Sequence, residues 1–162
     1  MTSVSLQKTV VNVLFFRNAA GIYGADGLKP ATAHSAGIDL RACPVEGESL
    51  AIPPGERRPI PSGIAVEPLT PHIAAFLYSR SGLGAVKGVT VAQGVGVVDP
   101  DYRGEIIVFL LNTGTQEYTV RQGERIAQLI FQPCVRPLFN TVSELGETAR
   151  GSGGFGHTGT TE

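Results

Sequence analysis

Short apolar runs that alternate with turn residues set the strongest limit on how this chain can fold. Turn signals such as Pro53-Pro54-Gly55 recur along the sequence, which contains 21 glycines and 11 prolines. The pieces between them are rich in valine, isoleucine, phenylalanine and tyrosine, which favour strands. Strands are predicted at residues 10–16, 63–66, 72–78, 105–111, 116–120 and 125–131. Since no long segment has helical periodicity and only 81–86 suits a short helix, the sequence predicts an all-β domain.

Composition narrows the partners and the cellular setting of such a domain. A length of 162 residues suits one domain, and 42% hydrophobic residues suffice for a core. The formal net charge of −1 gives no broad basic surface, so we expect neither nucleic acid nor a membrane as a partner. The two cysteines, Cys43 and Cys134, match no metal-ligand spacing and no disulfide framework. The apolar run at 10–16 is too short to span a bilayer, and a cytoplasmic protein is expected.

The predicted strand at 105–111 is apolar on both faces. Its residues from 106 onward read IIVFLL, without the alternation of polar and apolar residues that a half-exposed strand shows. Such a pattern predicts burial on both faces. In a chain this small, a subunit interface is one source of the second cover. A central position in a sandwich is the other explanation, and the sequence alone favours neither.

The composition changes after Phe139. Residues 141–162 contain few apolar side chains and many glycines, serines and threonines, which is typical of a segment that is disordered in isolation. We therefore predict two parts, a β domain at 1–139 and a flexible C-terminal arm at 140–162.

The arm ends in the glycine-rich sequence RGSGGFGHTG, which approaches a phosphate-binding P-loop. Gly151 and Gly156 fit that pattern, but His157 replaces the lysine, and too few residues follow for the helix that a P-loop opens. A P-loop is therefore a poor explanation. The glycines still let backbone N–H groups turn toward an anion, Arg150 adds a fork of donors, and Phe155 can stack on a base. Such an arm could fold over a bound nucleotide.

Polar residues interrupt several apolar segments. Asp39 lies in AGIDLRA between apolar neighbours, where a turn or cap is the simpler explanation. The stretch SRSGLG offers hydroxyl, guanidinium and backbone donors to an anion at the predicted helix start. A helix cap by Ser79 or Ser81 also explains it, and both can hold together. In GERIAQLIF, Arg125 and Gln128 need polar partners or a ligand if they are buried.

The stretch from Gln93 to Glu105 is interpreted as a hairpin. Its apolar ends flank the Asp-Pro-Asp turn chemistry of residues 99–101. A tight turn capped by Asp99 or Asp101 would explain these residues. A carboxylate and Tyr102 at the mouth of a hairpin would also suit a base and a flat wall for a sugar.

Together and in this order, five stretches resemble the motifs of the trimeric deoxyuridine triphosphatase (dUTPase) family. They are AGIDLRA, SRSGLG, GVVDPDYRGEI, GERIAQLIF and RGSGGFGHTG, and they span about 36–159. The resemblance implies a jelly-roll-like β domain (a β-clip) with one short helix and a flexible C-terminal arm. It also implies a homotrimer with shared active sites, in which the arm closes a neighbour's site and the strand at 105–111 lies at the interface.

The resemblance also implies an activity. The reaction is hydrolysis of dUTP to dUMP and pyrophosphate with Mg²⁺, which keeps uracil out of DNA and supplies dUMP for dTTP synthesis. Asp99 matches the catalytic aspartate of the third motif, the general base for a water that attacks the α-phosphorus in line. Asp39 matches the aspartate near the water ligands of the metal.

The remaining matches assign the substrate-binding residues. Phosphate contacts are implied for Arg80, Ser81, Gly82, Gln128, Arg150 and the amides around Gly154, Gly156 and His157, while Phe155 stacks on uracil. His157 stands where many relatives have serine and others histidine.

Base and sugar selection is implied for the stretch around Asp99. Backbone groups near Val97, Val98 and Ile107 would pair with the edge of uracil and reject cytosine, because unpaired buried polar groups are costly. Tyr102 would leave no room for a ribose 2′-hydroxyl. Gln93 stands where bacterial relatives often have a uracil-contacting asparagine, and it carries the same amide on a longer side chain.

Two other functions fit such a scaffold. A dCTP deaminase shares the fold and the trimer, but it usually lacks this aspartate–tyrosine stretch together with the glycine arm. A non-catalytic regulatory protein on the same scaffold is the second alternative. Such relatives typically have eroded motifs, whereas Asp99, Tyr102, Arg80 and Phe155 are all present here.

Overall fold

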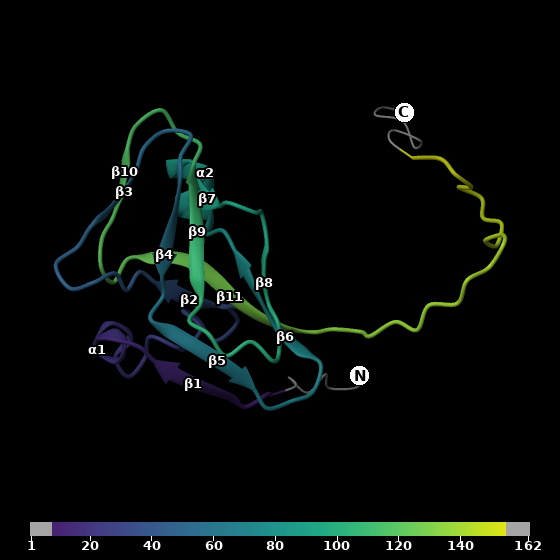
Figure 1. Cartoon of the computed structure of the whole chain (residues 1–162), viewed down its shortest axis with the longest axis horizontal. Helices are drawn as coiled ribbons and strands as arrows, with labels where there is room; N and C mark the ends of the chain where they lie inside the picture. Colours follow the sequence, from purple (N-terminus) through teal and green to yellow (C-terminus); the bar gives the residue numbers. More distant parts are fainter. Residues whose placement is uncertain (1–7, 155–162) are drawn as a thin grey trace.

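Short strands are the main regular elements of the computed structural model, which describes residues 8–154 (Figure 1). The strands of this part are β1 (Val11–Phe15), β2 (Ile38–Arg41), β3 (Leu50–Ile52), β4 (Arg57–Pro61), β5 (Ile64–Pro68), β6 (Ile73–Tyr78), β7 (Val89–Val91), β8 (Gly96–Val98), β9 (Ile107–Asn112), β10 (Tyr118–Val120) and β11 (Arg125–Pro133). Two short helices, α1 (Ala19–Tyr23) and α2 (Ser81–Lys87), are the helices of the described residues. The predicted all-β class is confirmed.

The strands pair antiparallel, in an order that differs from their order along the chain. The largest sheet has the order β2-β11-β6-β8, and the next has the order β4-β9-β7. The pairs β1-β5 and β10-β3 are the remaining sheets of the described residues. The nine-residue strand β11 lies between β2 and β6, whereas β8 pairs with β6 alone and forms one edge of its sheet.

Apolar side chains from both larger sheets fill a common core. Leu40 on β2 and Leu129 on β11 belong to the same buried cluster as Val108 and Leu110 on β9. Strand alternation sends every second side chain to this core. Burial of one such side chain stabilises the fold by about 1.5–3 kcal/mol relative to exposure. The core therefore fixes the relative position of the two sheets that carry the candidate site.

All the strands predicted from the sequence are observed. The ranges 10–16, 63–66, 72–78, 105–111, 116–120 and 125–131 correspond to β1, β5, β6, β9, β10 and β11. The helix predicted at 81–86 is α2. The capping prediction for α2 was wrong, because its N-cap residue is Arg80 and makes no side-chain cap hydrogen bond. The Ser79 hydroxyl instead accepts a hydrogen bond of 2.8 Å from the Val91 backbone N–H and ties this turn to β7.

Several short elements were not predicted. The strands β3 and β7 have only three residues each, and α1 has five, so the prediction of a single short helix was incomplete. The strand β4 contains Pro59 and Pro61, which argue against a strand in a sequence. It lies at the edge of its sheet, where proline is tolerated, and only Ile60 is buried.

The strand β9 is buried on one face only. Val108 and Leu110 are fully buried, whereas Ile107 and Phe109 on the opposite face are 38% and 43% exposed. Within one chain, the predicted burial on both faces is therefore wrong, although β9 is the central strand of its sheet. The IIVFLL sequence leaves an uncovered apolar face. A subunit interface as its cover stays a prediction.

The stretch from 93 to 105 does not form the predicted hairpin. The strand β8 pairs with β6, while β9 pairs with β4 and β7, so the two strands belong to different sheets. The segment between them, residues 99–106, is a loop that crosses from one sheet to the other. Its turn residues were recognised, but its strands pair with distant partners rather than with each other.

Beyond β11, residues 134–154 contain no helix or strand and extend away from the β domain (Figure 1). Most of their large apolar side chains are almost fully exposed, and Leu138 and Phe139 reach 98% and 90%, whereas Val142 is 53% exposed. The boundary predicted after residue 139 and the disorder of the arm remain predictions. Among the described residues, no helix is long and apolar enough to cross a membrane.

Candidate active site

A pocket of about 230 Å³ lies where β8, the 99–106 loop and the start of β9 meet. Six of its lining residues were predicted as site residues: Gln93, Val97, Val98, Asp99, Tyr102 and Ile107. Its volume is below the roughly 300–1,000 Å³ of pockets for drug-sized ligands. The pocket therefore suits one part of a nucleotide rather than a whole triphosphate.

Two strands at this pocket, β8 and the start of β9, each have an edge that no other strand of residues 8–154 pairs with. The strand β8 has a partner, β6, on one side only. At Ile107, β9 pairs with Pro61 of β4, while its ladder with β7 begins only at Leu110. Unpaired N–H and C=O groups along a strand edge can pair with another planar donor–acceptor edge. Val97, Val98 and Ile107 can therefore present backbone groups to the edge of a base.

The 99–106 loop is folded by hydrogen bonds within itself. The Tyr102 N–H donates to the Asp99 carbonyl at 3.1 Å, and the Tyr102 hydroxyl donates to the Glu105 carbonyl at 3.1 Å. The Tyr102 ring closes over Gly104, where an added Cβ would lie only 2.4 Å from the phenolic oxygen. The loop thereby holds the ring at the pocket while the Asp99 side chain is exposed.

A second polar cluster lies across β2, β11 and the start of α2. The Asp39 carboxylate accepts hydrogen bonds from Arg80 Nε at 2.8 Å and from Arg125 Nη1 at 3.2 Å. Gln128 on β11 stands directly opposite Asp39 on β2 and opposite Tyr78 on β6. Opposite residues of adjacent strands share a face with their Cβ atoms about 4.5–5.5 Å apart. The fold therefore brings together three predicted site residues from distant parts of the chain.

Cationic side chains surround a hollow of about 430 Å³ beside this cluster. It is lined by Arg41, Arg80, Gly82, Leu83, Lys87, Tyr118, Gly123, Glu124 and Arg125. Four of these side chains are cationic and one is acidic, so the hollow favours an anion. Ser81 is exposed at the start of α2. The phosphate-binding residues predicted at 80–82 thus lie at a basic surface.

The pocket and the basic hollow share no lining residue.

The site residues predicted in the C-terminal arm lie in or beyond the extended segment. Arg150 and Gly154 lie in the exposed segment that extends away from both sites (Figure 1). A turn forms here, where the Gly153 N–H donates to the Arg150 carbonyl at 3.1 Å. Phe155, Gly156 and His157 lie outside the described residues. Among residues 8–154, one chain therefore does not bring all its predicted groups together in one place.

The described residues contain no group of three or more histidine, cysteine, aspartate or glutamate side chains that could hold a metal ion. Asp39, predicted to act on a metal through water, has both carboxylate oxygens in ion pairs with arginines. A site made mainly by protein ligands is therefore not present in this part of the chain.

Several lining residues were missed from the sequence. Leu77, Gly96 and Ile106 complete the pocket; Gly96 and Ile106 lie at the two ends of the motif GVVDPDYRGEI but were assigned no role, and Leu77 lies in a predicted strand. Arg41 and Lys87 complete the basic hollow. Glu105 also lines the pocket, and its place in the same motif, just before a long apolar run, was the available clue.

Comparison with known proteins assigns the chain to a family. A family model described as dUTPase matches residues 25–159. The deoxyuridine 5'-triphosphate nucleotidohydrolase of Enterobacter sp. (strain 638) is 45% identical over 129 residues, 80% of this chain and 84% of that protein. The protein of the same name from Escherichia coli (strain K12 / DH10B) is 44% identical over the same shares. The chain belongs to the dUTPase family.

Solved dUTPase structures agree with the fold. The dUTPase of Staphylococcus bacteriophage 80alpha with dUPNHPP superposes with a TM-score of 0.78 at 22% identity, over 93% of this chain and 98% of that one. The dUTPase of Streptococcus mutans gives a TM-score of 0.64 at 27% identity, over 80% and 98%. The predicted jelly-roll-like β-clip fold is confirmed. The dUTPase match includes every predicted site residue, but it begins after β1 and α1.

Proposed function

We propose that this chain hydrolyses dUTP to dUMP and pyrophosphate by Mg²⁺-assisted, in-line attack of water on the α-phosphorus, with Asp99 as general base. Membership of the dUTPase family makes the chain a dUTP diphosphatase. The observation that carries the finer mechanism is the pocket, which gathers Asp99, Tyr102 and the backbone edges of β8 and β9 around a volume suited to a nucleoside.

The pocket would select the base and the sugar. Uracil would pair with the backbone edge at Val97, Val98 and Ile107, with the Gln93 amide beside it. A base whose hydrogen-bond donors and acceptors are exchanged relative to uracil would leave buried backbone groups unpaired. This penalty discriminates strongly against that base. The Tyr102 ring would lie against the sugar and exclude a 2′-hydroxyl.

In this proposal Asp99 activates the attacking water. Its carboxylate is exposed at the rim of the pocket, next to the strand edge that would hold the base. In the proposed step, Asp99 takes one proton from a water as the water oxygen bonds to the α-phosphorus. The bond to the bridging oxygen breaks, and pyrophosphate leaves with its electron pair. General-base catalysis of this kind contributes typically about 10²–10⁴-fold.

The phosphates would be held by the basic residues. Arg80, Ser81 and Gly82 would contact them at the start of α2, with Gln128 near the α-phosphate. Arg150 and the amides around Gly154, Gly156 and His157 would bind the β- and γ-phosphates, with Phe155 stacked on uracil. Such positioning and charge stabilisation supply most of the catalysis in phosphoryl transfer.

The residues present fit a magnesium ion that would be held mainly by the phosphates of the bound nucleotide. Mg²⁺ usually keeps several waters and takes one or two carboxylates plus phosphate oxygens. Asp39 and Gln128 offer one carboxylate and one amide oxygen on the same face of the sheet, which suits contacts to metal-bound water. When bound, the ion would neutralise phosphate charge and orient the triphosphate.

A homotrimer with shared active sites would unite the separated parts. The pocket and the basic hollow are separate on one chain, and the segment that leads to Phe155 extends away from both. The uncovered apolar face of β9 and the exposed side chains of residues 134–145 offer surfaces that other copies would cover. In this proposal residues 1–139 form the β domain, and the arm at 140–162 completes a neighbour's site.

The proposed cellular role follows from the reaction. Removal of dUTP keeps uracil out of DNA, and the product dUMP supplies dTTP synthesis. The proposal places the enzyme in the cytoplasm with dUTP as its ligand, and it needs neither nucleic acid nor a membrane.

The test is pyrophosphate release from dUTP, with dTTP, dCTP and UTP as matched substrates, first with Mg²⁺ and then with EDTA. Metal-dependent release from dUTP alone is the expected result. Ammonia release from dCTP would instead identify a deaminase. Binding of dUTP without turnover would favour the non-catalytic alternative and overturn the proposal.

A further inference from the structure

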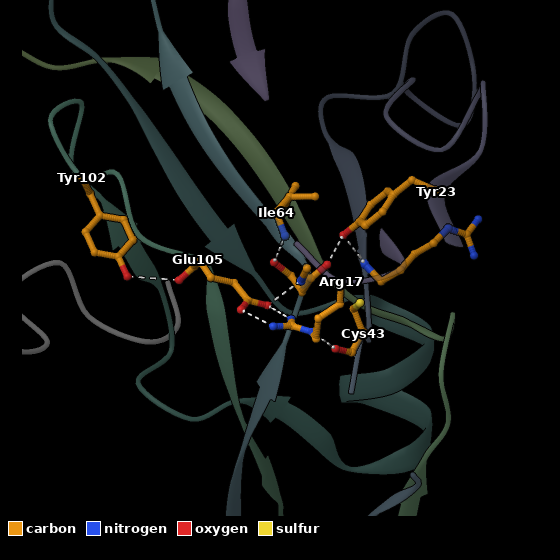
Figure 2. A network of polar contacts seen from close by, with 9 residues as sticks. Arg17, Tyr23, Cys43, Ile64, Tyr102 and Glu105 are labelled. Atoms are coloured by element: carbon orange, nitrogen blue, oxygen red, sulfur yellow. Dashed lines mark hydrogen bonds and ion pairs between the residues drawn. The ribbon is translucent and has the colours of Figure 1, made fainter. Parts of the chain in front are cut away.

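A network of polar contacts joins the end of β1 to the pocket loop (Figure 2). Arg17 Nη1 donates to Glu105 Oε2 at 2.9 Å, and Nη2 donates to the other carboxylate oxygen. Arg17 Nε donates to the Cys43 carbonyl at 3.3 Å. The paired Glu105 side chain is only 15% exposed. A two-pronged contact of this kind fixes direction as well as distance.

The backbone around the contact has an unusual conformation. Arg17 has a φ of +48°, a left-handed conformation that few non-glycine residues adopt. Gly63 has a φ of +75°, and its N–H donates to Glu105 Oε1 at 2.7 Å. A Cβ at Gly63 would lie 2.6 Å from the Ala19 Cβ and 2.7 Å from the Cys43 sulfur, so only glycine fits there. Two residues with a positive φ, Arg17 and Gly63, therefore both bind the Glu105 carboxylate.

Glu105 connects this network to the ligand pocket. It lines the pocket, and its backbone carbonyl accepts the hydrogen bond from the Tyr102 hydroxyl. Figure 2 shows Glu105 between Tyr102 on one side and Arg17 on the other. The next residue, Ile106, is buried, and its N–H donates to the Ile64 carbonyl at 2.9 Å. The Glu105 side chain is thus anchored by Arg17 in the turn after β1 and by the Gly63 N–H, while its backbone carbonyl holds the Tyr102 ring.

A second ion pair links the same loop to the sheet of β1 and β5, and it is more exposed to solvent than the pair of Arg17 and Glu105. Arg103 Nη2 lies 2.9 Å from Glu67 Oε1, and these two side chains are 53% and 38% exposed, against 37% and 15% for Arg17 and Glu105. Asn12 on β1 donates to the same Glu67 carboxylate. Exposed ion pairs contribute little because water screens them. The partly buried, bidentate contact of Arg17 is therefore the one that can set the position of the loop.

We propose that Arg17 is a positioning residue for sugar selection, which sets the Tyr102 ring against the pocket through Glu105. This inference rests on the proposed function of the pocket. Arg17 lies before residue 25, where the dUTPase family match begins, so the contact joins an element outside that match to a loop inside it. Removal of the guanidinium leaves the Glu105 side chain held by the Gly63 N–H alone, which lets the carbonyl that holds Tyr102 shift and opens space for a 2′-hydroxyl.

The test compares binding of dUMP and UMP by calorimetry to the unaltered protein and to three variants. The unaltered protein is expected to prefer dUMP. In Arg17→Gln this preference should fall by at least about tenfold, since displacement of a positioned group by 1 Å has effects of up to about 10²-fold. Arg17→Lys should keep part of it, because an ammonium still pairs with Glu105 but lacks the fork. The matched control Glu67→Gln, on the exposed pair of the same loop, should keep it fully.

A purely structural role for Arg17 gives a different pattern. In that case Arg17→Gln lowers the melting temperature but leaves the dUMP/UMP preference unchanged in the folded protein, and this result overturns the inference. Equal loss of preference in Glu67→Gln also overturns it, because the effect would then belong to any ion pair of the loop. The binding assay needs no turnover. Failure of the unaltered protein to hydrolyse dUTP while it still prefers dUMP would count against the proposed catalysis alone.

Discussion

The hydroxyl of Tyr23 lies in the core with both of its hydrogen-bonding functions used. It donates to the Ser62 carbonyl at 3.1 Å and accepts from the Arg41 backbone N–H at 3.0 Å. Burial raises the pKa of Tyr23 to about 12, although the Arg41 N–H partly offsets this by favouring the phenolate. One side chain thereby joins α1 to β2 and to the turn before β5. Its titration makes the fold sensitive to alkaline pH.

We expect the free energy of unfolding to fall as the pH rises from about 10 toward about 12. In this range the unfolded state loses the Tyr23 proton while the folded state keeps it, so the unfolded state binds fewer protons and gains stability. The contribution of Tyr23 is on the order of 2–3 kcal/mol. It is complete below the unfolded pKa and is lost as the pH passes the folded one.

Urea unfolding of Tyr23→Phe at about pH 8 and about pH 11 checks this. The variant should be less stable by about 1–3 kcal/mol at the lower pH, because two buried groups lose their partner. It should also lose less stability on the way to the higher pH. Tyr118→Phe is a useful comparison, since burial and the neighbouring Glu124 also raise the pKa of Tyr118 to about 12. An identical alkaline loss with and without the Tyr23 hydroxyl would contradict the account.

The role proposed for Asp99 concerns chemistry rather than stability. Its side chain is exposed at the pocket rim, so replacement by asparagine should preserve folding and nucleotide binding. We expect Asp99→Asn to lower kcat for dUTP by at least about 10²-fold. Steady-state kinetics together with dUMP binding check this. The matched control is Asp101→Asn in the same loop, which should retain most of the activity. Normal turnover by Asp99→Asn would remove Asp99 as the base.

Among the elements, β9 connects the pocket to the opposite end of the domain. It begins at Ile107, which lines the pocket, and ends at Asn112, which is 1% exposed. Asn112 Nδ2 donates to the Ile52 carbonyl at 2.8 Å and to the Gln116 carbonyl at 2.7 Å. Its Oδ1 accepts from the Gly114 N–H at 2.9 Å. This amide therefore fastens the end of β9 to β3 and shapes the turn toward β10.

Asn112→Ala should lower the free energy of unfolding by about 1–3 kcal/mol, because it leaves buried backbone groups without partners. The kcat/KM for dUTP of the folded protein should change little, because the pocket lies at the other end of β9. Denaturant titration and kinetics at low temperature measure the two effects separately. Asn12→Ala, which removes an exposed hydrogen bond, should stay within about 0.5 kcal/mol of the unaltered protein. Equal stability of the two variants would show that the Asn112 contacts are unimportant.

A comparison of long and short strands shows how far local sequence predicts this fold. Long runs of β-branched and aromatic residues identified β1, β6, β9 and β11 because their preference is local. The three-residue strands β3 and β7 were missed, since each forms only by pairing with a strand far along the chain. The β8–β9 stretch was misread for the same reason. Turn chemistry is local, whereas the choice of pairing partner is not.

At the scale of the whole molecule, the parts of the candidate site differ in how far the sequence could predict them. The pocket residues 93–107 are close in sequence, so their assembly could be predicted from one motif. The cluster of Asp39, Arg80 and Gln128 was predicted only through the family resemblance. The contact between Arg17 and Glu105 joins residues 88 positions apart and left no pattern in the sequence. Long-range contacts of this kind require the fold itself.

The extended C-terminal segment gives a prediction at this scale. Deletion of residues 150–162 should lower kcat/KM for dUTP by at least about tenfold, because it removes Arg150 and the glycine-rich donors. The melting temperature should not change, since residues 150–154 are outside the buried core. Kinetics, thermal unfolding and a light-scattering mass measure activity, stability and assembly. Gly146→Ala, in open space on the same segment, serves as the control. Full activity after deletion would show that the arm has no catalytic role.

The position of β11 has a consequence for how the protein is made. It is the last strand of residues 8–154, yet it lies inside the four-stranded sheet, with Gln128 beside Asp39. During synthesis this sheet cannot close before Pro133 has been added, and such long-range pairing is slow. A chain that stops earlier leaves the edges of β2 and β6 open, and open edges template aggregation. Premature termination before β11 therefore yields an aggregating fragment rather than a weakly active enzyme.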